Sequence, residues 1–105
     1  CPDLRSVCKL VAEDKLTEPA YTSSAGPIAP IDMLYGYRPS MAAGNLYMSH
    51  RSGFTQKTLI GTFKHFGFES VAGARREEYF DLFCLASKKK LREDELIGLA
   101  KQHFP

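Results

Sequence analysis

The adjacent residues His50 and Arg51 have the side chains best suited to chemistry in this sequence. They lie in a polar stretch that contains Gly53 and directly precedes a helix-start signal at Thr55. An imidazole exchanges a proton near neutral pH and can accept one from a hydroxyl or an amine, and a guanidinium can bind a carboxylate or a phosphate. The pattern predicts a turn over the end of a sheet, with His50 as catalytic base and Arg51 as substrate clamp. The alternative interpretation is a surface histidine and an arginine that bonds to loop carbonyls.

A second candidate group, Tyr35, Tyr37 and Arg38, lies a few residues earlier. Aromatic rings beside a guanidinium suit stacking on a flat or acidic substrate, so these residues are predicted to bind substrate. Tyrosine is equally common where one end of the ring is buried and the other end reaches water. A core role for the two tyrosines is therefore the alternative.

The histidines and cysteines do not have the spacing of a metal site. His65 and His103 fall in expected helices without a second ligand three or four residues away. Cys1, Cys8 and Cys84 are an odd number of cysteines with no C-x-x-C pair, which indicates neither a zinc site nor a disulfide framework. A reducing cytoplasm fits this cysteine usage.

Composition and charge narrow the class of protein further. The 105 residues are 44% apolar and 25% charged, which is typical of one ordinary globular domain covering 1–105. Fourteen basic and twelve acidic residues, mixed along the chain, give a net charge of +2, so we do not expect nucleic acid as a partner. No apolar run approaches the roughly 20 residues of a membrane span, so we expect no membrane partner either.

The elements that must position these side chains follow from caps, breakers and apolar periodicity. Asp3 can cap a first helix, and Thr55 starts the clearest helix, which Gly67 ends. Between them, a stretch rich in Pro, Gly and Ser predicts a loop that is either a binding segment or a flexible linker. The expected elements are a helix at 4–14, the loop at 16–30, short helices at 30–36 and 40–47, a helix at 55–67, strands at 69–76 and 79–87, and a helix at 93–103.

The second predicted strand is apolar on both of its alternating faces, which is typical of a central strand covered on two sides. The two strands should pair as an antiparallel hairpin. Asp81 interrupts the apolar pattern and needs a partner such as Arg75 or Arg51 if it is buried. The chain supplies too few strands to surround such a hairpin, and Cys1-Pro2 has the character of the end of an extended segment.

Four stretches carry a resemblance to a known family: CPDLRSV at 1–7, SAGPIAPIDMLYG at 24–36, MSHRSGFT at 48–55 and FDL at 80–82. Together with the order helix, irregular excursion, helix and hairpin, they resemble the C-terminal half of a class I, Rossmann-like S-adenosylmethionine-dependent methyltransferase of bacteria. The resemblance covers essentially the whole chain. It implies an α+β fragment of an α/β fold, in which a final antiparallel pair closes the sheet.

The resemblance also implies that a missing segment binds the cofactor. In that fold S-adenosylmethionine is held by a glycine-rich turn after the first strand and by an acidic residue that ends the second. The glycines here never form G-x-G-x-x-G. We therefore expect the missing N-terminal half to bind the cofactor. This chain, which begins at Cys1 without a methionine, is expected to be a trimmed or excerpted acceptor-side part that is inactive alone.

A different class of function is a small non-enzymatic interaction module that dimerises. An unpaired sheet edge is a template for pairing with another chain, so a homo-oligomer is expected under either interpretation. An upstream segment with a glycine-rich strand–turn–helix would favour the enzyme, and its absence would favour the module.

Overall fold

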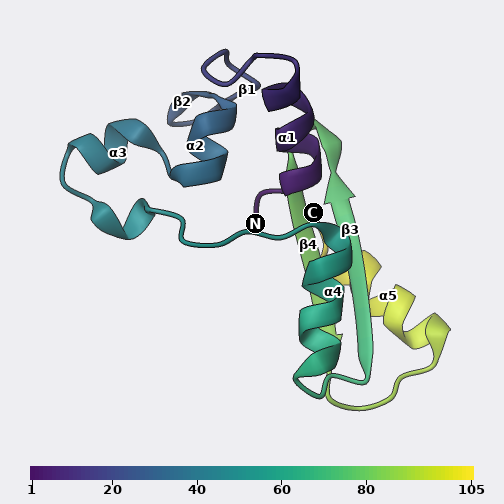
Figure 1. The fold of residues 1–105 in the computed structure, drawn as a ribbon. Helices are drawn as coiled ribbons and strands as arrows, with labels where there is room; N and C mark the ends of the chain where they lie inside the picture. Colours follow the sequence, from purple (N-terminus) through teal and green to yellow (C-terminus); the bar gives the residue numbers. More distant parts are fainter.

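Two antiparallel hairpins and five α-helices make up the computed structural model, which describes residues 1–105 (Figure 1). The predicted α+β class is confirmed, and none of the helices has the length and apolar character needed to cross a membrane. In chain order the elements are α1 (Leu4–Ala12), β1 (Tyr21–Ser23), β2 (Gly26–Ile28), α2 (Pro30–Tyr35), α3 (Arg38–Ala42), the 3-10 turn η1 (Leu46–Met48), α4 (Gln56–His65), β3 (Ser70–Arg76), the 3-10 turn η2 (Glu77–Tyr79), β4 (Asp81–Ser87) and α5 (Glu93–His103).

The long helices begin and end at the signals read from the sequence. The Asp3 carboxylate accepts the Arg5 N–H at 3.2 Å at the start of α1, and the Thr55 hydroxyl accepts the Thr58 N–H at 3.3 Å at the start of α4. Gly67 follows α4 with φ of +90°, the left-handed conformation typical of helix ends. The predicted helices at 4–14, 55–67 and 93–103 are confirmed to within two residues at each end.

The β3–β4 hairpin forms the centre of the lower part of the molecule and has a helix on each face (Figure 1). Its strands pair along their whole length, with Gly73 opposite Cys84. Helix α4 packs closely on one face because Gly73 has no side chain: a Cβ there would lie 2.9 Å from Cδ1 of Ile60. On the other face, Phe83 meets Phe104 just beyond the end of α5, with ring centroids 6.2 Å apart.

The first residues of the chain extend this sheet on the other side of β4. Cys1 and Leu82 exchange two backbone hydrogen bonds, 3.1 Å from Cys1 N to Leu82 O and 2.7 Å from Leu82 N to Cys1 O. Pro2 lies opposite Asp81 in the antiparallel sense. The extended character predicted for Cys1-Pro2 is therefore confirmed, and β4 begins as a central strand.

The expectation of a structureless loop at 16–30 is wrong, because β1 and β2 form a small antiparallel hairpin there. The Ser23 hydroxyl donates to the Gly26 carbonyl and accepts the Ala25 N–H, both at 3.1 Å, so this side chain closes the turn. Gly26 has φ of +120°, which suits glycine alone. Strands of three residues are too short to show an alternating pattern in the sequence.

Two predicted boundaries are also wrong. The helix expected at 40–47 begins earlier, at Arg38, and ends at Ala42, because Gly44 takes φ of +100° and separates it from η1. The strand expected from residue 79 begins at Asp81, because Phe80 has φ of +55° and leaves the extended conformation. The turn between the hairpin strands is therefore longer than the sequence indicated.

The molecule is elongated, with α1, β1, β2, α2 and α3 in an upper part and α4 and α5 in a lower part, and the β3–β4 hairpin extends from beside α1 down into the lower part (Figure 1). Its radius of gyration is 15.6 Å, whereas a compact chain of this length has about 13 Å. Buried residues number 11 of 105, and Val7, Ile28 and Met33 form the core cluster of the upper part. Much apolar surface therefore remains open to solvent.

Candidate functional site

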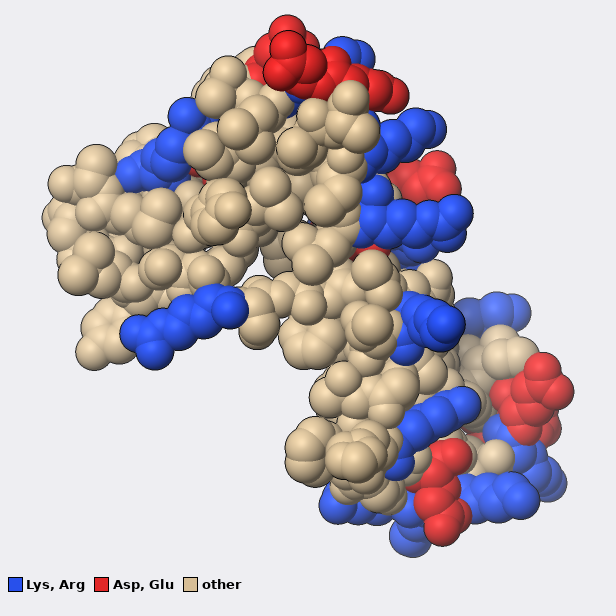
Figure 2. Space-filling model, viewed as in Figure 1, with Lys and Arg blue, Asp and Glu red and all other residues tan.

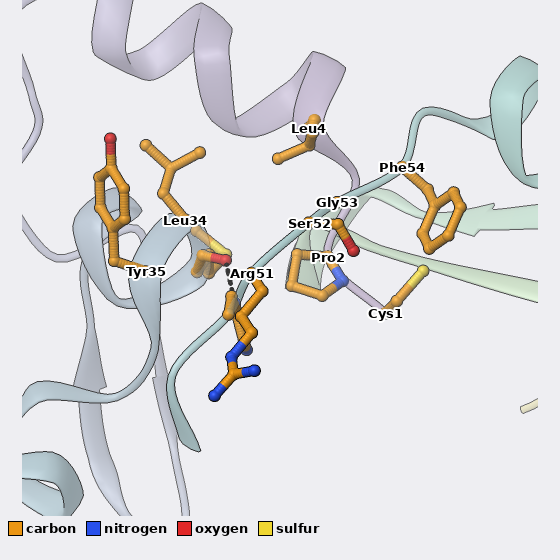
Figure 3. A pocket seen from close by; sticks show the side chains of 11 residues that line it. Cys1, Pro2, Leu4, Leu34, Tyr35, Arg51, Ser52, Gly53 and Phe54 are labelled. Carbon is orange, nitrogen blue, oxygen red and sulfur yellow. Dashed lines mark hydrogen bonds between the residues drawn. The ribbon is translucent and has the colours of Figure 1, made fainter. Parts of the chain in front are cut away.

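A cavity of about 380 Å³ lies where the end of α2, the start of α1 and the segment after η1 meet (Figure 3). Its walls are mostly apolar, and its polar side chains include His50, Arg51 and Ser52. The structure thus brings together His50, Arg51 and Tyr35 from the predicted site residues. The complete lining is Cys1, Pro2, Leu4, Met33, Leu34, Tyr35, His50, Arg51, Ser52, Gly53 and Phe54.

Two glycines allow the segment after η1 to pass close to both helices. Gly36 ends α2 with φ of +114°, and a Cβ on it would collide with the Met48 carbonyl oxygen. Gly53 lies against α1, where a Cβ would come within 2.8 Å of Cδ1 of Leu4. The Leu4 N–H donates to the Phe54 carbonyl at 3.0 Å and fixes the segment there. These close approaches place His50 and Arg51 at the cavity.

His50 holds the last turn of α2. Its backbone N–H donates to the Tyr35 carbonyl at 3.1 Å, and its Nδ1 lies 2.8 Å from the Met33 carbonyl oxygen. Carbonyl groups at a helix end lack partners within the helix. Because a carbonyl oxygen can only accept, Nδ1 carries the proton, and in the tautomer that this bond selects the lone pair is on Nε2. His50 therefore stabilises α2 and still has a free proton acceptor.

Arg51 is exposed at the open side of the cavity (Figure 3). The ion pairs of the structure do not include it, and no aspartate or glutamate lines the cavity. Figure 2 shows a hollow between the upper and lower parts that is surrounded by uncharged atoms, with an isolated basic side chain at its edge. The Arg51 guanidinium is thus free to meet an anion that enters from solvent.

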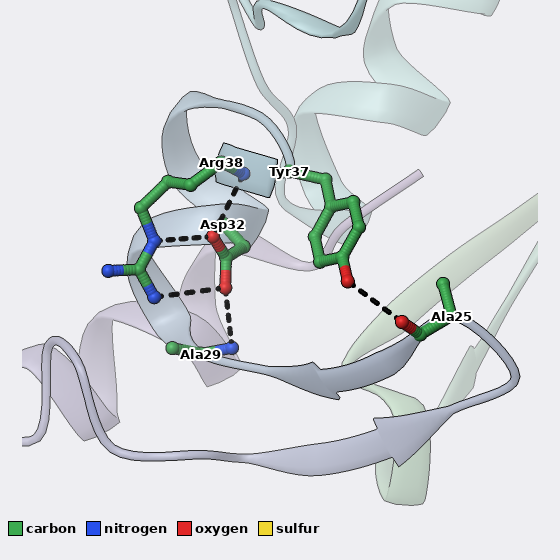
Figure 4. Close-up of polar contacts among 5 residues, drawn as sticks. All are labelled: Ala25, Ala29, Asp32, Tyr37 and Arg38. Atoms are coloured by element: carbon green, nitrogen blue, oxygen red, sulfur yellow. Dashed lines mark hydrogen bonds and ion pairs between the residues drawn. The ribbon is translucent and has the colours of Figure 1, made fainter. Parts of the chain in front are cut away.

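The other two predicted site residues make contacts elsewhere (Figure 4). The Tyr37 hydroxyl donates to the Ala25 carbonyl at 2.9 Å and ties the α2–α3 corner to the β1–β2 turn. Arg38 pairs with Asp32, with Nε 2.7 Å from Oδ1. Neither Tyr37 nor Arg38 lines the cavity.

Asp32 is a buried carboxylate that the residue types alone do not single out. Its Oδ2 accepts the Ala29 N–H at 2.9 Å, and its Oδ1 accepts the Arg38 N–H at 3.2 Å. Burial raises the pKa of this carboxyl, but the hydrogen bonds from Arg38 and Ala29 outweigh burial and hold the pKa below its usual range. The signal in the sequence is its place in the first turn after Pro30, where an acidic side chain can bond back to the residue before the helix.

The partners predicted for Asp81, Arg75 and Arg51, are wrong. Nη2 of Arg76 lies 2.7 Å from Oδ2 of Asp81, whereas Arg75 pairs with Asp3. The register places Arg76 directly opposite Asp81, so both side chains share one face of the hairpin and Arg75 is on the other. The pair holds the hairpin end and does not line the cavity.

Comparisons of the chain with protein-family models, with curated proteins and with solved structures gave no match. The methyltransferase resemblance therefore rests on the sequence stretches quoted above and stays a prediction.

The residues of this chain do not fit an S-adenosylmethionine site. Such a site needs a glycine-rich turn that leaves space for the ligand and a carboxylate for the ribose hydroxyls. The cavity has no carboxylate, and its neighbouring glycines Gly36 and Gly53 are closely approached by Met48 and Leu4 instead. No group of three or more His, Cys, Asp or Glu side chains gathers as metal ligands do. The cavity suits a small molecule.

Proposed function

We propose that this chain is the acceptor-side, sheet-closing part of an S-adenosylmethionine-dependent methyltransferase whose cofactor binds to a preceding segment. The observation that carries the proposal is the antiparallel pairing of Cys1-Pro2 with β4. Strand β4 has β3 on one side and these first residues on the other. An extended segment that runs into Cys1 would therefore continue the sheet.

The hydrogen bonds of Leu82 set the register of that continuation. Residues of an antiparallel strand alternate in the edge to which they direct N–H and C=O. Because Leu82 bonds to Cys1, Cys84 and Ala86 direct theirs to the same edge, away from β3. A strand that precedes Cys1 would run antiparallel along β4 and satisfy these groups. The family resemblance implies the same arrangement, with an antiparallel pair at the end of the sheet.

Uncovered apolar surface also supports a larger parent protein. Leu46 and Tyr47 on η1 are 73% and 99% exposed, and Tyr35 is 65% exposed. Neighbouring apolar side chains in such numbers are typical of a surface that another segment covers.

The free thiols of Cys1, Cys8 and Cys84 support a reducing, cytoplasmic location. In this proposal the cavity is the acceptor side, with His50 as base.

The test compares the 105-residue chain with a longer parent chain that includes the residues upstream of Cys1. We expect the parent to bind S-adenosylmethionine in calorimetry with low-micromolar affinity, about −8 kcal/mol. The 105-residue chain should bind it weakly or not at all, because the ribose and glycine-turn contacts are missing. Tight binding by the 105-residue chain, or no binding by the parent, would overturn the proposal.

The variant Ala86→Pro tests the sheet continuation directly, because proline is tolerated where its missing N–H faces an open edge. In the 105-residue chain this N–H has no ladder partner, so we expect a small change in stability. In the parent chain the same change removes a ladder hydrogen bond and leaves its acceptor without a partner, so it should lower the free energy of unfolding by about 1–3 kcal/mol. Leu85→Pro is the matched control, since its N–H faces β3 and both chains should lose stability. Equal effects of Ala86→Pro in the two chains would contradict the continuation.

A non-enzymatic dimerising module is the second candidate, because the open edge of β4 can equally pair with a second copy. Sedimentation of the 105-residue chain at micromolar concentration measures this association, and Ala86→Pro should dissociate a dimer formed through that edge. A parent chain that also dimerises through β4, and that has no glycine-rich turn upstream, would favour the module over the enzyme.

A further inference from the structure

We propose that the cavity beside His50 binds a small molecule with a flat apolar body and one carboxylate or phosphate group, and that Arg51 holds this anionic group. The role of the molecule as methyl acceptor rests on the proposed function. The binding of the molecule to this chain does not rest on the proposed function, so it can be tested separately.

The size and walls of the cavity select the body of the ligand. Its volume of about 380 Å³ is at the lower end of the roughly 300–1,000 Å³ typical of small-molecule sites, so it suits one ring rather than a nucleotide. Leu4, Leu34 and Phe54 are among the apolar residues that line it (Figure 3). An apolar ring gains free energy by leaving water for such walls.

The charge of the cavity selects the substituent. Arg51 is the one charged side chain in the lining, and it has no carboxylate partner. A guanidinium presents a planar fork of N–H donors that matches the oxygens of a carboxylate or a phosphate. A cationic ligand would be repelled, and a neutral one would leave this donor fork without a charged partner. Four other arginines do form ion pairs, in which the guanidinium lies within 2.8 Å of an acidic side chain: Arg38, Arg75, Arg76 and Arg92.

His50 adds a further requirement. Its Nδ1–H is already bonded to the Met33 carbonyl at 2.8 Å, so the neutral ring can only accept, through Nε2. A ligand that has a hydroxyl or an amine in addition to its acid group would satisfy both His50 and Arg51. An aromatic hydroxy acid has these three features together.

Titration of the 105-residue chain by nuclear magnetic resonance tests the proposal with three probes. These are para-hydroxybenzoate, its uncharged isostere para-hydroxybenzamide, and phenyl phosphate. We expect the resonances of His50 and Phe54 to shift, and the benzoate to bind about tenfold more tightly than the benzamide. Arg51→Gln should remove this difference, whereas Arg92→Gln, at the exposed residue that precedes α5, should retain it. Tighter binding of phenyl phosphate than of the benzoate would identify the anionic group as a phosphate.

Two results would overturn the proposal. One is equal affinity for the benzoate and the benzamide, or no shift with any probe at millimolar concentration. The other is an unchanged preference in Arg51→Gln protein that circular dichroism shows to be folded. Neither result depends on S-adenosylmethionine, so failure of this proposal is distinguishable from failure of cofactor binding by the parent chain.

Discussion

Nε of Arg75 on β3 lies 2.8 Å from Oδ2 of Asp3, and this ion pair joins the start of α1 to the hairpin. Asp3 is completely buried, and its carboxylate also accepts the Ser6 hydroxyl at 2.7 Å and the Arg5 N–H at 3.2 Å. The Nε–H direction of Arg75 is too bent for a hydrogen bond, so the attraction between the two is chiefly electrostatic. One carboxylate thus caps a helix and neutralises a largely buried cation.

We predict that Asp3→Ala lowers the free energy of unfolding by about 3–5 kcal/mol, the range for breaking a buried pair. The change removes the α1 cap and leaves Arg75, whose side chain is 27% exposed, without its partner. Urea titration followed by circular dichroism measures the loss. Asp94→Ala is the control, because its carboxylate is 75% exposed in a surface pair with Arg92 and should change stability by about 0.5 kcal/mol or less.

The second prediction concerns acid stability and Asp32. The hydrogen bonds from Arg38 and Ala29 hold the pKa of the buried Asp32 carboxyl below its usual range despite burial. A carboxyl with a lowered pKa in the folded state contributes stability above its unfolded pKa, and this stability is lost as the pH falls through the folded pKa. We expect Asp32→Asn to be less stable than the unsubstituted 105-residue chain by about 1–2 kcal/mol at neutral pH.

The difference between the two proteins should shrink as the pH falls below the unfolded pKa of aspartate, about 3.9. Urea midpoints measured at neutral pH and in this acid range give the comparison. A difference that stays constant down to the lowest pH would show that Asp32 is not the titrating group. The control variant Asp94→Asn, at an exposed carboxylate, should have the stability of the unsubstituted 105-residue chain at each pH.

The third prediction separates the cysteines by reactivity. Burial raises the pKa of the Cys84 thiol, whereas Cys8 is exposed on α1. The thiolate is the nucleophile, so a raised pKa and limited access both slow alkylation. We expect iodoacetamide to modify Cys8 about tenfold faster than Cys84 in the folded chain, as measured by mass spectrometry of peptides. In urea the two rates should converge. Similar rates in the folded chain would contradict the prediction, because they would show that the Cys84 thiol is as reactive as the exposed Cys8 thiol.

The long elements of the fold could be predicted because each has a local signal. Asp3 and Thr55 mark helix starts, and Gly67 marks a helix end, through bonds to residues a few positions away. The β1–β2 hairpin could not be predicted, since it depends on the Ser23 side chain closing the turn and on Ile28 packing in the core. The Ile28 contact is decided by tertiary packing, and strands of three residues are too short to show a periodic pattern.

The residues of the candidate site could also be predicted only in part from the sequence. Residue types alone single out His50, but they do not show which of the other predicted site residues share its cavity. Gly36, with φ of +114°, redirects the chain between Tyr35, which lines the cavity, and Tyr37, which bonds to Ala25. The backbone conformation of Gly36 therefore gives different surroundings to Tyr35 and Tyr37, although they are only two positions apart.

The last prediction separates the two roles of His50, as a structural partner of α2 and as a proton acceptor. In the structure, Nδ1 of His50 lies 2.8 Å from the Met33 carbonyl oxygen. In His50→Asn, the amide NH₂ can take the position of Nδ1–H and donate to the same carbonyl. The variant has no equivalent of Nε2. We expect the free energy of unfolding to change by about 0.5 kcal/mol or less, while turnover of the longer parent chain, in its proposed methyltransferase role, falls by about 10²–10⁴-fold.

Steady-state kinetics on folded parent protein and urea titration of the 105-residue chain together check this prediction. His50→Gln reverses the geometry, because its amide reaches the position of Nε2 and loses the bond to Met33, so it should lose stability as well as turnover. His65→Asn, at an exposed position on α4, should leave both quantities unchanged. Wild-type turnover in folded His50→Asn would show that His50 acts through α2 alone, and the proton acceptor would then have to be sought among the other polar groups of the cavity.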